Sequence, residues 1–273
     1  MVDQKTKAAN FRALHVRSGT FIIPNPWDAG TAKILTHLRF EALATTSAGL
    51  AFALGRPDGA ADRNETLANA RAIVEATHLP VSADLDNGFG ASPDVVAETI
   101  QLAAAAGLVG GSIEDSTGDP TKPIYDFNLT VERVAAAVAA ARAQDIYFTL
   151  TARAENFLHG RPDLDDTIKR LQAFEKAGAD VLYAPGLPTL EAIRAVCSAV
   201  KRPVNVLANG AFTLKQYEDA GAKRVSVGSR LSLAALGAFS RGAQEMKDAG
   251  SFNFARDAIP YAEINELMKK ETQ

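Results

Sequence analysis

Eight short runs of apolar residues recur along the chain. They are rich in Val, Ile, Leu and Thr and show little strict alternation of apolar and polar positions, which is typical of parallel strands buried on both faces. We therefore predict strands at FII (21–23), ALATT (42–46), PVSAD (80–84), GGSIE (110–114), IYFTLTA (146–152), DVLYA (180–184), PVNVLA (203–208) and RVSVG (224–228).

Stretches with helical period separate these runs, for example ETLANARAIVEA (65–76) and TLEAIRAVCSAV (189–200). Hydroxyl residues that can cap free amides stand before several of them, as Thr189 does. Three predicted helices finish on Ala-Gly just before a strand, at Gly107, Gly178 and Gly221. Glycine suits the left-handed turn that closes a helix, so the pattern indicates a repeated helix–strand unit.

Eight strands that alternate with helices, without a change of composition between the halves, favour a (β/α)8 TIM-type barrel over a doubly wound sheet. We expect one barrel domain over residues 1–273, with the barrel itself at about 10–235. The helical segment at about 236–273 exceeds what the eighth unit needs. We expect it to cover the barrel or to be exchanged between subunits of a homo-oligomer, a dimer or a tetramer.

Composition and charge limit the classes of function that the sequence allows. A formal net charge of −3 over 273 residues gives no electrostatic basis for binding nucleic acid or an anionic membrane. No run approaches the roughly 18 apolar residues that a membrane helix needs, and the N-terminal MVDQKTKAANFRAL lacks the apolar core of a signal peptide. Cys197 is the only cysteine, which excludes an intrachain disulfide. We expect a cytoplasmic protein whose partner is a small molecule.

In such barrels, chemistry is located at the carboxyl ends of the strands. Residues that could serve a site stand at those ends here, and several of them are acids. They are Asn25, Trp27 and Asp28 after the first strand, Ser47, Gly49 and Asp58 after the second, Asp84 and Asp86 at the third, Glu114 and Asp115 at the fourth, Arg153 and Glu155 at the fifth, and Asn209 at the seventh.

Carboxylates gathered in one cleft repel one another unless a cation compensates them. One arginine cannot balance this set, whereas a hard dication can. Oxygen ligands without a nearby His or Cys indicate Mg²⁺, or Mn²⁺, over Zn²⁺. We predict that Arg153 clamps a substrate carboxylate in bidentate fashion, and that Gly88 and Gly90 let the backbone approach the site.

The segments NPWDAGTAKIL, TTSAGLAFALGRPDG, SADLDNGFG, SIED, TARAEN with LHGRPDLDDTIKR, and VNVLANG together resemble the isocitrate lyase/phosphoenolpyruvate mutase superfamily, from about residue 10 to about 235. The resemblance implies a Mg²⁺-dependent barrel that makes or breaks C–C or P–C bonds beside a carboxylate, through an enolate of a 2-oxo acid. It also implies a tetramer formed by exchange of C-terminal helices.

By position, the resemblance assigns the metal to Asp84, with Asp58, Asp86 and Glu114 holding its waters. Further residues are implied to bind a small carboxylate substrate, and Arg153 to stabilise the enolate. This substrate-binding set comprises Trp27, Ser47, Gly49, Asp84, Arg153, Glu155 and Asn209. Asp115 and Glu155 also fit purely structural roles, as partners of a helix and of Arg153.

Two departures from the sequence pattern of the superfamily limit the reactions that this protein is expected to catalyse. The segment STGDPTKPIYDFNLT (116–130) has neither the cysteine nor the histidine of the lyase branch. Lys122 could stand for the lysine of the mutase branch, but Ile124 stands where that branch has an asparagine. Cys197 falls in a predicted helix, where a buried thiol is expected. Isocitrate cleavage is therefore disfavoured, and mutase activity less strongly so.

The remaining interpretation is that the protein is a lyase or decarboxylase acting on a small 2-oxo or 2-hydroxy dicarboxylic acid such as oxaloacetate. Two alternatives stay open: P–C bond chemistry on phosphonopyruvate or phosphoenolpyruvate, and a non-catalytic protein that binds 2-oxo acids. The catalytic candidates are Arg153 and Asp58, together with groups that could protonate the enolate: Lys122, Tyr125, Tyr183, His159 or a metal-bound water.

Overall fold

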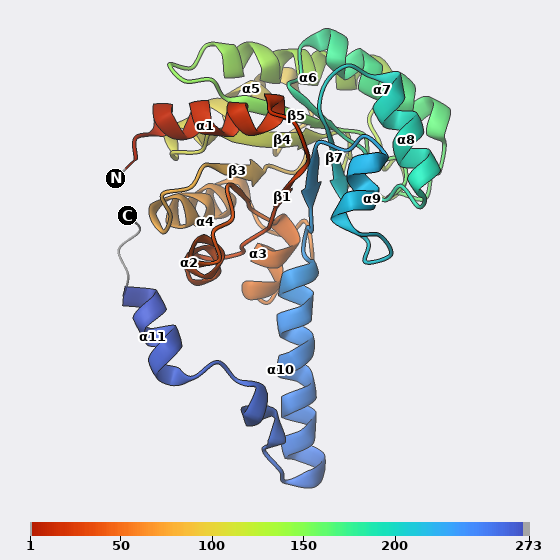
Figure 1. Ribbon diagram of the computed structural model, residues 1–273. Helices are drawn as coiled ribbons and strands as arrows, with labels where there is room; N and C mark the ends of the chain where they lie inside the picture. The colour runs from red at the N-terminus through yellow and green to blue at the C-terminus, as the bar shows by residue number, and fades with distance from the viewer. Residues whose placement is uncertain (1, 270–273) are drawn as a thin grey trace.

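The computed structural model describes residues 2–269, and its eight parallel strands form a nearly closed (β/α)8 barrel (Figure 1). The strands are β1(Phe21–Ile23), β2(Leu43–Ala44), β3(Val81–Asp84), β4(Gly110–Glu114), β5(Thr149–Arg153), β6(Val181–Tyr183), β7(Val204–Leu207) and β8(Arg224–Ser226). They pair in the order β1-β8-β7-β6-β5-β4-β3-β2. The amide of Ala44 donates to the carbonyl of Pro24 at 3.1 Å and bridges β2 to β1. The predicted fold class and all eight strands are confirmed.

The helices of the βα units surround the strands. They are α2(Ala29–His37), α3(Ser47–Ala53), α4(Arg63–Glu75), α5(Pro93–Ala105), α6(Phe127–Arg142), α7(Leu164–Ala177), α8(Leu190–Ala199) and α9(Leu214–Asp219). The predicted turns after α5, α7 and α9 are left-handed, with φ of 92° at Gly107, 102° at Gly178 and 95° at Gly221. Side-chain caps begin most helices, including the Thr189 cap of α8.

The N-terminal helix α1(Gln4–Val16) packs against the amino end of the barrel. Phe11 is fully buried against Phe21, the first residue of β1, and Val109, just before β4. His15 points further in, toward Arg224 at the start of β8. Burial and the nearby guanidinium lower the pKa of His15 to about 3, so its imidazole is neutral in the folded protein.

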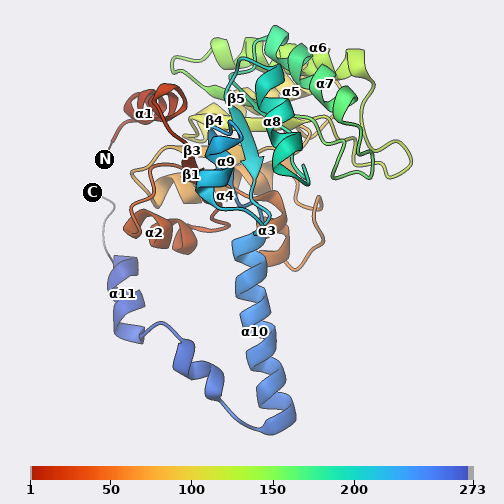
Figure 2. The same cartoon turned by 45° about the vertical axis from the view of Figure 1, so that its right-hand side comes forward.

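The C-terminal segment consists of α10(Arg230–Ala249), the short 3-10 helix η1(Asn253–Asp257) and α11(Tyr261–Lys269). Figures 1 and 2 show α10 projecting from the barrel and the chain turning back, so that α11 lies beside α2. Lys33 Nζ donates to the carbonyl of Met268 at 2.6 Å. Between residues 2 and 269, no helix combines the length and the apolar character needed to cross a membrane.

Candidate metal and substrate site

Three carboxylates from two neighbouring strands meet at the carboxyl end of the barrel. Asp84 ends β3, Asp86 lies two residues further on, and Glu114 ends β4. One carboxylate oxygen from each lies within 4.8 Å of the others. The parallel register produces this meeting, because Asp84 pairs with Ser112 while Glu114 pairs with Arg153 on β5.

Arg153 lies among these carboxylates. Its Nη1 is 2.7 Å from Asp84 Oδ1, its Nη2 is 3.1 Å from Glu114 Oε2, and its Nε is 2.9 Å from Glu155 Oε1. Although burial opposes the charge, Glu155, Glu114 and Asp84 together raise the pKa of Arg153 well above its ordinary value. Every guanidinium nitrogen therefore binds a protein carboxylate. Three protein carboxylates thus share the charge of Arg153, and its bidentate contact with a substrate carboxylate stays a prediction.

Negative charge exceeds positive charge in this cluster. Burial raises the pKa of Asp86, and repulsion from Asp84 and Glu114 raises it further. Partial burial and Asp84 also raise the pKa of Asp58. Raised carboxyl pKa values mean that the ionised set lacks a counter-charge, which a dication would supply. An all-oxygen donor set of this kind fits Mg²⁺.

The loop from Asp84 to Ala91 is held in an unusual backbone conformation. Asp86 and Phe89 both have positive φ, at 46° and 62°, a region that non-glycine residues rarely enter. Arg133 on α6 is buried, and its guanidinium donates to the carbonyls of Asn87, Gly90 and Ala91. Arg133 thus fixes the loop that carries Asp86, a role that the sequence alone did not indicate.

The two glycines of this loop allow it to pack closely against a helix. A Cβ at Gly90 would lie 2.6 Å from Val95 Cγ1, and one at Gly88 would lie 3.0 Å from Val96 Cγ2. Both valines are in the first turn of α5. The glycines are therefore required for the close approach of this loop to α5.

Asp115 and Glu155 have structural partners. Asp115 Oδ2 lies 3.0 Å from Arg170 Nη1 on α7, and its Oδ1 accepts from the amide of Glu155 at 2.8 Å. Neither residue lines the pocket, and both are almost fully buried. The structural alternative predicted for each is therefore what the geometry shows, with Glu155 orienting Arg153.

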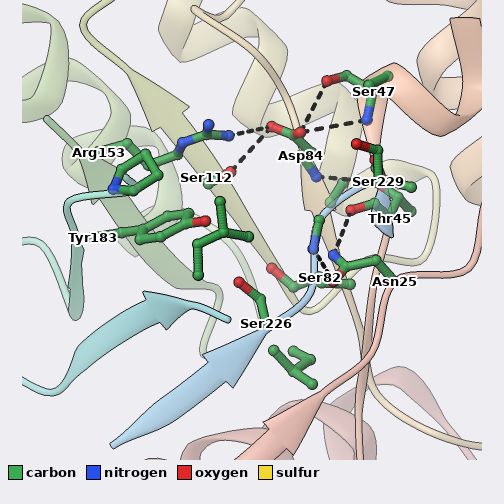
Figure 3. Close-up of a pocket in the computed structure, with 18 of the residues that line it drawn as sticks. Asn25, Thr45, Ser47, Ser82, Asp84, Ser112, Arg153, Tyr183, Ser226 and Ser229 are labelled. Atoms are coloured by element: carbon green, nitrogen blue, oxygen red, sulfur yellow. Dashed lines mark hydrogen bonds and ion pairs between the residues drawn. The ribbon is translucent and has the colours of Figure 1, made fainter. Parts of the chain in front are cut away.

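Beside the acidic cluster lies a pocket of about 170 Å³. Ser47, Asp58, Asp84 and Arg153 line it, together with groups that include Asn25, Thr45, Ser112, Tyr183, Ser226 and Ser229, most of them drawn in Figure 3. Ser47 Oγ donates to Asp84 Oδ2 at 2.9 Å. The pocket therefore offers many hydroxyl groups close to the candidate metal ligands.

Trp27 and Gly49 lie next to the pocket without lining it. A Cβ at Gly49 would come within 2.9 Å of Trp27 Cβ, so the absence of a side chain at Gly49 lets the tryptophan pack against α3. Trp27 itself is half-buried.

Three further residues predicted for the site have side chains that contact other parts of the protein. They are Asn209, Lys122 and Tyr125. Asn209, in the turn after β7, accepts at its Oδ1 from the hydroxyl of Tyr217 on α9 at 3.1 Å. Lys122 Nζ pairs with Asp126 at 2.7 Å on the exposed segment after β4. The ring of Tyr125 stacks under the Arg133 guanidinium, whose carbon lies 4.2 Å from the ring centre. The structure therefore does not bring these three predicted residues into the pocket.

The pocket-lining groups that motif reasoning missed lie on the strands themselves. Ser82, Ser112, Arg224 and Ser226 occupy alternate positions of β3, β4 and β8, which point into the barrel. Polar residues at every second position of otherwise apolar strands are the signal that could have identified them.

A TIM-type barrel with an acidic cluster that could hold a cation at the carboxyl ends of β3 and β4 defines the class of the protein. The family model described as phosphoenolpyruvate phosphomutase matches residues 11–247. The chain therefore belongs to this family, within the isocitrate lyase/phosphoenolpyruvate mutase superfamily.

Three relatives illustrate the range of the superfamily. A crystal structure from Burkholderia cenocepacia J2315, described as a "putative lyase/mutase", is 57% identical, covers 98% of both chains and has a TM-score of 0.96. The 2-methylisocitrate lyase of Escherichia coli K12 is 30% identical over 86% of this chain and 81% of its own. A phosphonopyruvate hydrolase in complex with oxalate and Mg²⁺ is 25% identical, with a TM-score of 0.85 over 98% of this chain and 95% of that one.

Proposed function

We propose that this protein is a Mg²⁺-dependent lyase that cleaves a small 2-oxo or 2-hydroxy dicarboxylic acid, of which oxaloacetate is the simplest. The observation that carries the proposal is the meeting of Asp84, Asp86 and Glu114, with Arg153 bonded to two of them, at the rim of a hydroxyl-lined pocket. The Mg²⁺ in the related phosphonopyruvate hydrolase supports the choice of metal.

The residues of this chain prepare the site. Asp84, Asp86 and Glu114 would hold the metal, which would supply Lewis-acid stabilisation of the negative charge that develops when the bond breaks. Ser47 and Arg153 fix the orientation of Asp84 through hydrogen bonds to its two oxygens. Preorganised charge of this kind needs no rearrangement during the reaction, which is the source of its effect on rate.

Tyr183 is the best-placed protein group to return a proton to the enolate. It lines the pocket and is nearly buried, and the guanidinium carbon of Arg153 lies 5.2 Å from its ring centre. Burial raises the pKa of Tyr183 to about 12, so its hydroxyl keeps its proton at neutral pH. Water is the alternative proton donor.

The direct test is incubation with oxaloacetate and Mg²⁺, with and without EDTA. We expect oxaloacetate to be consumed well above its uncatalysed rate in solution, with pyruvate or oxalate as the product. EDTA should abolish this activity. Tight binding of 2-oxo acids without turnover of any of a panel of substrates would instead indicate a binding protein.

Phosphonopyruvate is the second candidate substrate, favoured by the matching family model and by the phosphonopyruvate hydrolase relative. Lys122, the residue that could serve this chemistry, is bonded to Asp126 outside the pocket. Release of phosphate, or formation of phosphoenolpyruvate, in the same assay would identify this reaction.

We also propose that the C-terminal segment mediates self-association. From Leu231 to Tyr261 it exposes many large apolar side chains, and an apolar surface of this extent marks an interaction site. These exposed residues are Leu231, Leu233, Leu236, Phe239, Met246, Phe252, Phe254, Ile259 and Tyr261.

Replacing Phe239 and Tyr261 with glutamate should shift the protein from oligomer to monomer, because both side chains are strongly exposed here and charge would disfavour their burial in an interface. Light scattering after size-exclusion chromatography measures the mass. Val16→Glu, at another exposed apolar position, is the control. A wild-type mass of one chain would contradict the proposal.

A further inference from the structure

The interior of this barrel is unusually polar below the candidate metal site. Barrels of this type normally fill their interior with bulky branched side chains. Here the inward positions below the rim include Ser82 on β3, Ser112 on β4 and Thr151 on β5. Ser82 and Ser112 line the pocket, as Figure 3 shows, so the cavity continues downward from the metal ligands into the barrel.

A buried cation lies at the floor of this cavity. Arg224, the first residue of β8, is only 5% exposed, and it lines the same pocket. Its Nε donates to Asn205 Oδ1 at 2.8 Å and its Nη2 to Thr151 Oγ1 at 3.0 Å. Its Nη1 lies 3.2 Å from His15 Nε2.

All three of these partners are uncharged. The Nδ1 of His15 lies 2.8 Å from the carbonyl of Phe11, which places the ring proton there and leaves Nε2 to accept from Arg224. Among the residues from 2 to 269, no carboxylate pairs with Arg224, and burial lowers its pKa to about 10. A buried charge without a counter-ion costs free energy.

The guanidinium also has donors to spare. It carries five N–H groups, and the three contacts above use three of them. One N–H on each Nη is left for a further acceptor. Arg224 therefore combines an uncompensated positive charge with free hydrogen-bonding capacity inside the pocket.

The other arginine of the pocket differs in its charge balance, because each of its three contacts is to a carboxylate. Arg153 is bonded through all three of its nitrogens to Asp84, Glu114 and Glu155. A substrate carboxylate that is not bound to the metal therefore needs a different cation, and Arg224 is the one that no protein carboxylate neutralises.

The spacing suits a short dicarboxylate. Arg224 bonds Thr151, two residues before Arg153 on β5, and two strand residues span about 6.6 Å. Along β5, the position that Arg224 contacts is thus separated from the position of Arg153 by roughly the length of a small dicarboxylic acid.

We propose that the barrel floor at Arg224 is a carboxylate subsite, which holds the second carboxylate of a 2-oxo dicarboxylate whose 2-oxo acid end lies at the metal. This inference rests on the proposed function and specifies its substrate class. A cation beside a carboxylate stabilises the anion, so the subsite suits a carboxylate that survives the reaction and not one that leaves as carbon dioxide. It favours cleavage within the carbon chain over decarboxylation.

Calorimetric titration of the full chain with Mg²⁺ present tests the proposal without requiring turnover. The probes are pyruvate, which lacks a second carboxylate, and 3,3-difluorooxaloacetate, which has one. The wild-type protein should prefer the dicarboxylate by about tenfold or more, the size expected of a charged hydrogen bond. Arg224→Met should remove this preference and leave pyruvate affinity unchanged, and Arg224→Lys should keep part of it.

Asn205→Asp is the second variant, in case Arg224→Met fails to fold. It places a carboxylate of the same shape 2.8 Å from Arg224 Nε, so it should compensate the buried charge without loss of stability and still remove the preference. Arg230→Met is the matched control, because Arg230 is an exposed arginine beyond the end of the same strand and does not line the pocket. It should behave as wild type.

Three results would overturn the proposal. The first is that the wild-type protein does not prefer the dicarboxylate, and the second is that folded Arg224→Met or Asn205→Asp keeps the preference unchanged. The third is that these variants lose affinity for both probes equally. Failure of the proposed function is separate, because it would appear as absent Mg²⁺-dependent turnover while the binding preference remained.

Discussion

Replacing Asp84 with asparagine is expected to abolish Mg²⁺-dependent turnover, with kcat/KM falling by about 10²–10³-fold or more, the loss produced by removing a group that stabilises the transition state. Asp84 lies at the centre of the candidate site, because one oxygen bonds Arg153 at 2.7 Å and the other accepts from Ser47 at 2.9 Å. Asparagine keeps the shape but removes the charge that binds a hard dication.

The same substitution should not destabilise the fold. It removes one of several carboxylates that repel one another, and Arg153 keeps Glu114 and Glu155 as partners. We expect an unchanged or higher melting temperature in the absence of metal, in line with the trade between stability and function at active sites.

Calorimetric titration with Mg²⁺, and Mn²⁺ binding followed by paramagnetic resonance, measure metal uptake independently of turnover. Asp145→Ala is the control, because Asp145 is an exposed carboxylate before β5, at the opposite end of the barrel. Wild-type metal affinity in Asp84→Asn would remove the metal assignment.

Arg153→Met should be the most destabilising change at the site. It would leave Asp84, Glu114 and Glu155 close together without their shared cation. Breaking a buried ion pair by removing one partner costs about 3–5 kcal/mol, which for a protein of this size lowers the melting temperature by about 10 °C.

Mg²⁺ should raise the melting temperature of Arg153→Met more than that of the wild-type protein, because the metal would compensate charges that the arginine no longer does. Adding Glu155→Gln should recover part of the stability, since Glu155 is almost fully buried and its main charged partner is Arg153. Differential scanning calorimetry with and without Mg²⁺ measures both effects. Equal metal stabilisation of variant and wild type would contradict the charge balance described here.

Motif reasoning found the acids of the site because they sit at the ends of predictable strands. Asp84 and Glu114 end runs whose burial on both faces identifies them as barrel strands, and the parallel arrangement brings strand ends together. The same reasoning was less successful for residues in the loops. Lys122 and Asn209 lie after strands as predicted, yet loop geometry directs their side chains to Asp126 and Tyr217.

The order of strands and helices, the acidic set at the carboxyl ends and its need for a cation follow from the sequence by itself, because they depend on local periodicity and on charge counted along the chain. The tertiary structure decided how those charges are shared. In the folded protein Arg153 pairs with three carboxylates, and Gly88 and Gly90 lie against α5. Arg224 lies among uncharged partners. These outcomes depend on distances between side chains remote in sequence, and no local pattern carries that information.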